Sequence, residues 1–159
     1  MKEPSRTRSL SLFLSYLFSL LFALLLVALC FLLPRLVPSL LSAPDLIGDR
    51  TALPRGVEIL ILVLSYLIVA VALLAVGFLL SLLRCVRRGE VFSLAAVKGI
   101  LRISVCCFAE GVLFLVIGIW FQLSLLVFAM ACFLALCLRI VGGVLLEAIR
   151  YKAENDLTV

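Results

Sequence analysis

The sequence contains no histidine and few charged residues. Only 14% of its 159 residues are charged, whereas a soluble domain has about 25%. Without histidine the chain lacks the commonest metal ligand and the usual general acid–base side chain. The sequence also has no Cys-x-x-Cys pair, no cofactor-binding motif and no cluster of carboxylates. These absences predict a protein that is not an enzyme and that holds no cofactor or metal ion.

The cysteines do not suggest a disulfide framework. None of the six lies in the long connection at residues 34–55, where a disulfide would persist in an oxidising compartment. We expect them to be small apolar packing residues. They are Cys30, Cys85, Cys106, Cys107, Cys132 and Cys137.

Apolar residues make up 66% of the chain, whereas a soluble protein has about 45–50%. Four segments reach the roughly 20 apolar residues that a membrane-spanning helix needs. The first segment is too long for a signal peptide and has no clean cleavage site, so we expect a retained anchor. The sequence predicts an all-α integral membrane protein with four transmembrane helices in an antiparallel bundle and no soluble domain. The predicted spans are residues 9–33, 57–83, 102–121 and 123–146.

Basic residues are distributed unevenly over the predicted connections. One side would carry Lys2, Arg6, Arg8, Arg84, Arg87, Arg88, Lys98, Arg102, Arg150 and Lys152, and the other side only Arg35, Arg50 and Arg55. Loops rich in lysine and arginine stay in the cytoplasm. Both termini, the loop at 84–93 and the tail at 148–159 are therefore expected to be cytoplasmic, with an outer loop at 34–55. The net charge of +5 then reflects topology rather than direct nucleic acid binding.

Two opposite charges, Glu110 and Arg139, fall inside the third and fourth predicted spans. A charge at membrane depth is costly and usually faces a partner or a water-filled cavity. A turn centred at position 123 would place the two residues at similar depth, and we expect them to form a buried pair. Two roles stay open for this pair: fixing the register of the two helices, or lining a polar site that binds a ligand or a proton.

Small residues recur at helical spacing in the same two spans. Such residues let membrane helices approach closely. The turn centred at position 123 would set Ser104 opposite Gly142 and Gly111 opposite Ala135. The same stripes would also allow packing between copies of the chain as a homo-oligomer.

The two longer connections contain recognisable local signals. Four prolines in residues 34–55 oppose a continuous helix, so the first span is expected to end at Pro34. In the loop at 84–93, Gly89 suits a turn and Ser93 suits a helix N-cap. The helix that follows would present Lys98 and Arg102 to lipid headgroups.

The loop and the tail together carry a family resemblance. Gly89 and Phe92 form a Gly-x-x-Phe turn before the basic helix with Lys98 and Arg102, and the chain ends in YKAENDLTV. With the four-span layout, the chain resembles a family of small bacterial membrane proteins known as domain of unknown function 2975. The resemblance implies no catalytic residues. It implies an association with a helix-turn-helix regulator of the Xre/Cro type.

These observations favour a bacterial inner-membrane sensor or anchor that communicates with such a cytoplasmic regulator. Contacts with the partner or with lipid are expected from Arg87, Arg88, Lys98, Arg102, Leu157, Thr158 and Val159. The segment Leu157–Val159 would dock by adding a strand to an exposed edge of the partner. The alternative is a small proton-coupled transporter or an immunity-type exporter that depends on Glu110.

Overall fold

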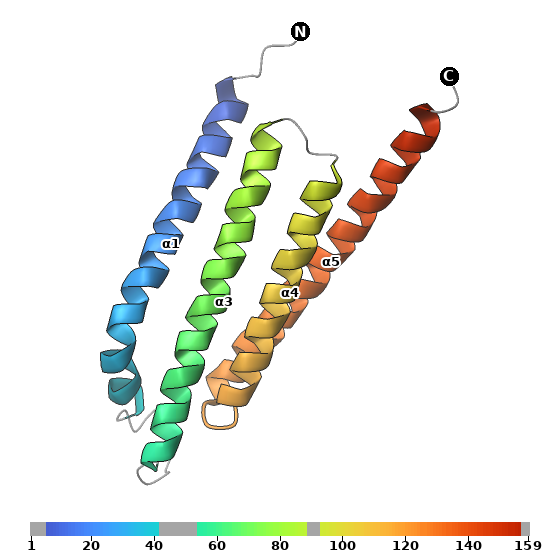
Figure 1. The fold of residues 1–159 in the computed structure, drawn as a ribbon. Coiled ribbons are helices and arrows are strands. Elements are labelled where there is room, and N and C mark those ends of the chain that lie inside the picture. Colours follow the sequence, from blue (N-terminus) through green and yellow to red (C-terminus); the bar gives the residue numbers. More distant parts are fainter. Residues whose placement is uncertain (1–5, 42–53, 89–92, 157–159) are drawn as a thin grey trace.

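A computed structural model describes residues 6–41, 54–88 and 93–156. They form four helices: α1 (Arg6–Leu41), α3 (Arg55–Arg87), α4 (Leu94–Ile117) and α5 (Gln122–Asp156) (Figure 1). Each helix contains a stretch that is long and apolar enough to cross a membrane. The predictions of an all-helical chain and of four candidate membrane spans are confirmed.

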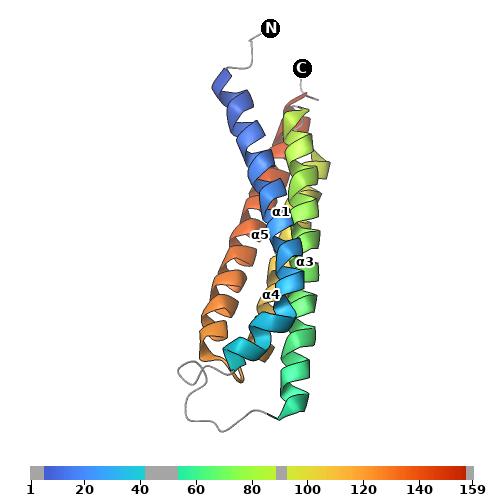
Figure 2. The same ribbon diagram turned by 90° about the vertical axis from the view of Figure 1, so that its left-hand side faces the viewer.

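The helices pack in chain order. α1 contacts α3, α3 contacts α4, and α4 contacts α5, while no other pair of these described helices is in contact. In Figure 1 successive helices run in opposite directions, so that α1 begins and α5 ends at the same end of the molecule. Seen from the side, α1, α3 and α5 can each be followed along the long axis of the molecule, while α4 lies largely behind α1 and α3 (Figure 2). The bundle is therefore open, because its first and last helices do not close on each other.

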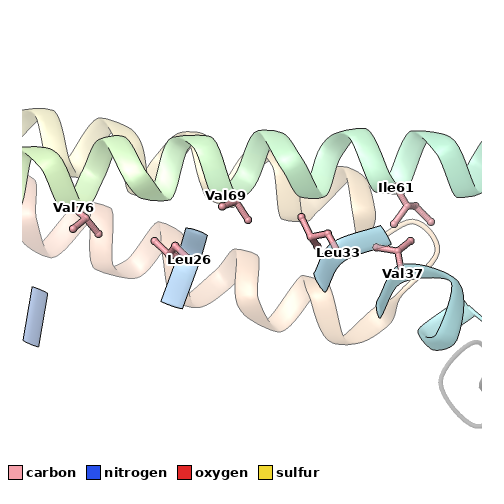
Figure 3. Packing of buried hydrophobic residues seen from close by; sticks show 6 residues of the cluster. All are labelled: Leu26, Leu33, Val37, Ile61, Val69 and Val76. Atoms are coloured by element: carbon pink, nitrogen blue, oxygen red, sulfur yellow. The ribbon is translucent and has the colours of Figure 1, made fainter. Parts of the chain in front are cut away.

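A cluster of buried apolar residues joins α1 and α3. Its members recur at helical spacing on the two facing sides (Figure 3): Leu26, Leu33 and Val37 from α1, and Ile61, Val69 and Val76 from α3. Most other large apolar side chains are exposed. Exposed apolar side chains of this kind are typical of helices that are surrounded by lipid. Lipid tails are themselves apolar and therefore do not drive such side chains into a core.

The first helix continues past the point where the sequence predicts its end. α1 includes Pro34 and Pro38 and ends at Leu41, so the predicted end at Pro34 is wrong. A proline inside a helix leaves the carbonyl four residues earlier without its usual N–H donor. For Pro34 that carbonyl belongs to Cys30, and the Tyr66 hydroxyl of α3 donates a hydrogen bond to it at 3.3 Å. A donor from a neighbouring helix is one way in which membrane helices tolerate proline.

Replacing Tyr66 with phenylalanine should therefore destabilise the α1–α3 pair. Loss of one such hydrogen bond is expected to lower the free energy of unfolding by about 0.5–1.5 kcal/mol. The control is Tyr16→Phe, which removes a hydroxyl from an exposed tyrosine of α1. Reversible unfolding in mixed micelles measures both variants, and equal effects would contradict the role given to Tyr66.

Several boundaries follow from local signals. Ser93 caps α4, because its side chain accepts a hydrogen bond from the Ala96 amide at 3.2 Å, and this prediction is confirmed. α3 extends the second predicted span to Arg55 and Arg87. α5 runs on to Asp156, where the polar end of the sequence favours a stop. The predictions for Gly89, for Leu157–Val159 and for most of the outer loop lie outside the described residues.

Candidate functional site

α4 and α5 pack through small side chains, as the sequence predicts. The Ser104 hydroxyl donates a hydrogen bond to the Ala135 carbonyl at 2.8 Å, and both residues are buried. At Gly111, an added Cβ would lie 3.3 Å from the Cys132 sulfur and 3.5 Å from the Ala131 Cβ. The backbone of α4 therefore lies directly against the side chains of α5 at this level.

The register of these two helices differs from the predicted one. Ser104 meets Ala135 rather than Gly142, and Gly142 meets Leu101. Gly111 lies against Ala131 and Cys132 rather than opposite Ala135. The cause is the turn between the helices. The turn occupies residues 118–121 and so lies before position 123. In it the Trp120 amide donates a hydrogen bond to the Ile117 carbonyl, and the Ser124 amide donates one to the Phe121 carbonyl.

Glu110 lies on the side of α4 that faces α3. It follows Gly99 by three helical turns and so shares its face, and a Cβ at Gly99 would lie 3.5 Å from Leu82 of α3. α3 and α4 run in opposite directions, because Gly99 lies against Leu82 while the later residue Arg102 lies over the earlier residue Phe78. Eight residues beyond Arg102 on α4 therefore correspond to about seven or eight residues before Phe78 on α3. This places Glu110 level with Val71, near the middle of α3.

One oxygen of the Glu110 carboxyl group has no partner. Its Oε1 is buried and makes no hydrogen bond with any described residue. An unsatisfied buried polar atom costs roughly 1–3 kcal/mol, and in native proteins such an atom calls for a specific explanation, functional use among them. Glu110 therefore has a buried carboxyl oxygen without a partner among the described residues, and it lies within a candidate membrane span.

Arg139 does not supply the missing partner, and the predicted pair is wrong. The two residues form no ion pair. Glu110 is about level with Cys132, and Arg139 lies seven residues further along α5, which is about 10 Å at 1.5 Å per residue. The facing sides differ as well, because α5 packs against the Ser104 side of α4. Arg139 is exposed and lies at the depth of Leu101 to Ser104.

Basic residues gather at one end of the molecule. The last turn of α3 carries Arg84 and Arg87, Arg88 follows it, and the first turns of α4 carry Lys98 and Arg102. These turns lie at the same end as the start of α1 and the end of α5 (Figure 1). At that end α3 and α4 form a groove of about 370 Å³, lined by Phe78, Lys98, Leu101, Arg102, Val105 and Cys106.

Within the described ranges, no three histidine, cysteine, aspartate or glutamate side chains gather as metal ligands would. All six cysteines are free thiols in helical segments. Comparison with known proteins found no matching family model, no similar curated protein and no similar solved structure. The chemistry of the described fold is thus concentrated in the Glu110 carboxyl group and in the basic end of α3 and α4.

Proposed function

We propose that this protein is a non-enzymatic membrane sensor or anchor of the bacterial inner membrane that communicates with a cytoplasmic regulator. The observation that carries the proposal is the unpartnered Glu110 oxygen at mid-depth. A buried ionisable group is costly to keep in a membrane unless it is used. In this account Glu110 responds to the state of the membrane, and the helices transmit the response to the basic end.

The uneven distribution of basic residues supports the orientation. Among the described residues, the helix ends around Arg88 carry many lysines and arginines, while the opposite ends carry Arg35 and Arg55. The rule that basic loops stay inside places the basic end in the cytoplasm. Both ends of the chain then belong to the cytoplasmic side, which gives a multi-pass protein with an antiparallel helix order.

The proposed partner is a helix-turn-helix regulator of the Xre/Cro type. The resemblance to domain of unknown function 2975 suggests this class, and the basic end offers a docking surface around Arg87 and Arg88, which are both exposed. The segment Leu157–Val159, which follows α5, would complete the contact. No nucleic acid need touch the membrane protein, because the regulator itself would bind DNA.

The partner can be identified by mild crosslinking in native membranes, purification of the tagged protein and mass spectrometry. A regulator that is captured with the full chain, and lost when residues 157–159 are deleted, is the expected result. The matched control replaces Leu157–Val159 with three serines, which keeps the length but removes the apolar side chains. Recovery of the protein alone, or only with copies of itself, would contradict the proposal.

The unpartnered carboxyl oxygen also favours a second candidate, a proton-coupled transporter or immunity-type exporter that works as an oligomer. A single chain offers little support for it, because Glu110 lines neither the groove between α3 and α4 nor a second groove between α1 and α3, which is formed by Val37, Pro38, Arg55, Glu58, Ile59 and Leu62. Proton flux into vesicles that is lost in Glu110→Gln would establish this reading. No flux with either protein would exclude it.

A further inference from the structure

The groove between α3 and α4 combines two cations with an apolar wall. Lys98 and Arg102 stand one turn apart on α4 and are both exposed. The rest of the groove lining consists of Phe78, Leu101, Val105 and Cys106. Charge and apolar surface thus meet in one groove, as they do in a phospholipid.

Neither cation is neutralised by the described part of the protein. No carboxylate among the described residues forms an ion pair with Lys98 or Arg102, and no acidic residue lines the groove. The Arg102 guanidinium instead lies 5.6 Å from the centre of the Phe78 ring. A cation over an aromatic face is attracted by the ring but keeps its charge, so the guanidinium is held in place and still able to bind an anion.

The depth of the groove agrees with a headgroup. Lys98 and Arg102 follow the start of α4 by four and eight residues, which corresponds to about 6 and 12 Å along the helix. Both side chains are long enough to reach the headgroup layer from there. Leu101 and Val105 are exposed beside them and face the region of the acyl chains.

We propose that this groove is a binding site for an anionic phospholipid, with Lys98 and Arg102 holding the headgroup phosphate and an acyl chain lying along Phe78, Leu101 and Val105. A free phosphate ion would use the two cations but not the apolar wall, which extends deeper into the membrane than the charges do. The proposal rests on the membrane location of the helices and not on the proposed regulator. It can therefore fail or succeed independently of the proposed function.

The test is native mass spectrometry of the full chain, released from nanodiscs that contain phosphatidylglycerol and phosphatidylcholine in equal amounts. Wild-type protein should retain phosphatidylglycerol preferentially. The double variant Lys98→Gln/Arg102→Gln should retain about thirtyfold less of it, since each of the two cations near the surface contributes on the order of 1 kcal/mol and about 1.4 kcal/mol corresponds to a factor of ten. The matched control is Arg87→Gln/Arg88→Gln, which removes two exposed cations from the same end but outside the groove.

Two further variants separate the groove from general charge. Lys98→Arg/Arg102→Lys should keep most of the retention, and its circular dichroism reports whether the fold is intact. Val105→Trp keeps both cations but fills the apolar wall, and it should displace the lipid. Equal losses in the groove variant and the Arg87/Arg88 control would overturn the proposal in favour of diffuse attraction. Displacement of the lipid by millimolar inorganic phosphate, or full retention in Val105→Trp, would also overturn it.

Discussion

Replacing Gly111 with leucine is expected to produce the largest loss of folded protein of any single substitution in α4. A Cβ alone would lie 3.3 Å from the Cys132 sulfur and 3.6 Å from the Phe128 ring. Leucine adds three more carbons where α5 leaves no room, and overpacking of this kind costs about 1–3 kcal/mol or more. The two helices must separate, which also strains the hydrogen bond from Ser104 to Ala135. Reversible unfolding in mixed micelles measures the change.

The chain offers a matched control for this result. Gly143 lies on α5, the helix that packs against Gly111, but a Cβ added at Gly143 meets nothing within 4 Å. Gly143→Leu should therefore leave the free energy of unfolding nearly unchanged, and Gly111→Ala should fall between the two. If Gly111→Leu and Gly143→Leu were equally stable, α4 and α5 would not approach each other through Gly111.

The second large effect concerns Glu110 and Arg139, the two charged residues inside the candidate spans of α4 and α5. Glu110→Leu is expected to raise the free energy of unfolding by roughly 1–3 kcal/mol, because it removes a buried oxygen that has no partner. Arg139→Leu should not lower stability, since Arg139 is exposed and forms no ion pair. The double variant should show the sum of the two effects within about 0.5 kcal/mol, as expected of independent sites.

A double-mutant cycle on unfolding in bilayers supplies the measurement. A buried pair gives a different result, because loss of one partner leaves an uncompensated charge and costs about 3–5 kcal/mol. Strong destabilisation by Glu110→Leu that is relieved by adding Arg139→Leu would restore the predicted pair. It would also remove the reason to assign Glu110 a role in sensing.

The sequence was sufficient for features that depend on composition and local signals. Long apolar stretches predict the four candidate spans, and Ser93 predicts the start of α4 from its own hydroxyl. The small residues around Gly111 likewise predict a close approach of two helices. Each of these features depends on a few neighbouring residues, so no knowledge of the rest of the fold is needed.

Features that depend on contacts between helices could not be predicted in the same way. The helix passes through Pro34 because Tyr66, 32 residues later in the chain, supplies a donor to the Cys30 carbonyl. The predicted Glu110–Arg139 pair is wrong because it depends on where the turn between α4 and α5 lies. A shift of the turn by about three residues changes both the depth of a residue on the helix and the side that it faces. Similar distances from an assumed turn are weak evidence for an intramembrane ion pair.

The groove at Lys98 and Arg102 lies between these two cases. Spacing along the sequence predicts that both cations face the headgroups. Phe78 lies on the preceding helix and lines the groove together with the two cations. No pattern in the sequence predicts its contact with Arg102. Only the packing of α3 against α4 brings the aromatic ring under the guanidinium.

We propose above all that Glu110 links the state of the membrane to a partner at the cytoplasmic end. The most direct test captures partners by mild crosslinking from membranes that contain wild-type protein or Glu110→Gln at equal levels. The substitution should leave the helices folded but change the amount of captured regulator severalfold. Capture of the same regulator in the same amount by both proteins would contradict the claim.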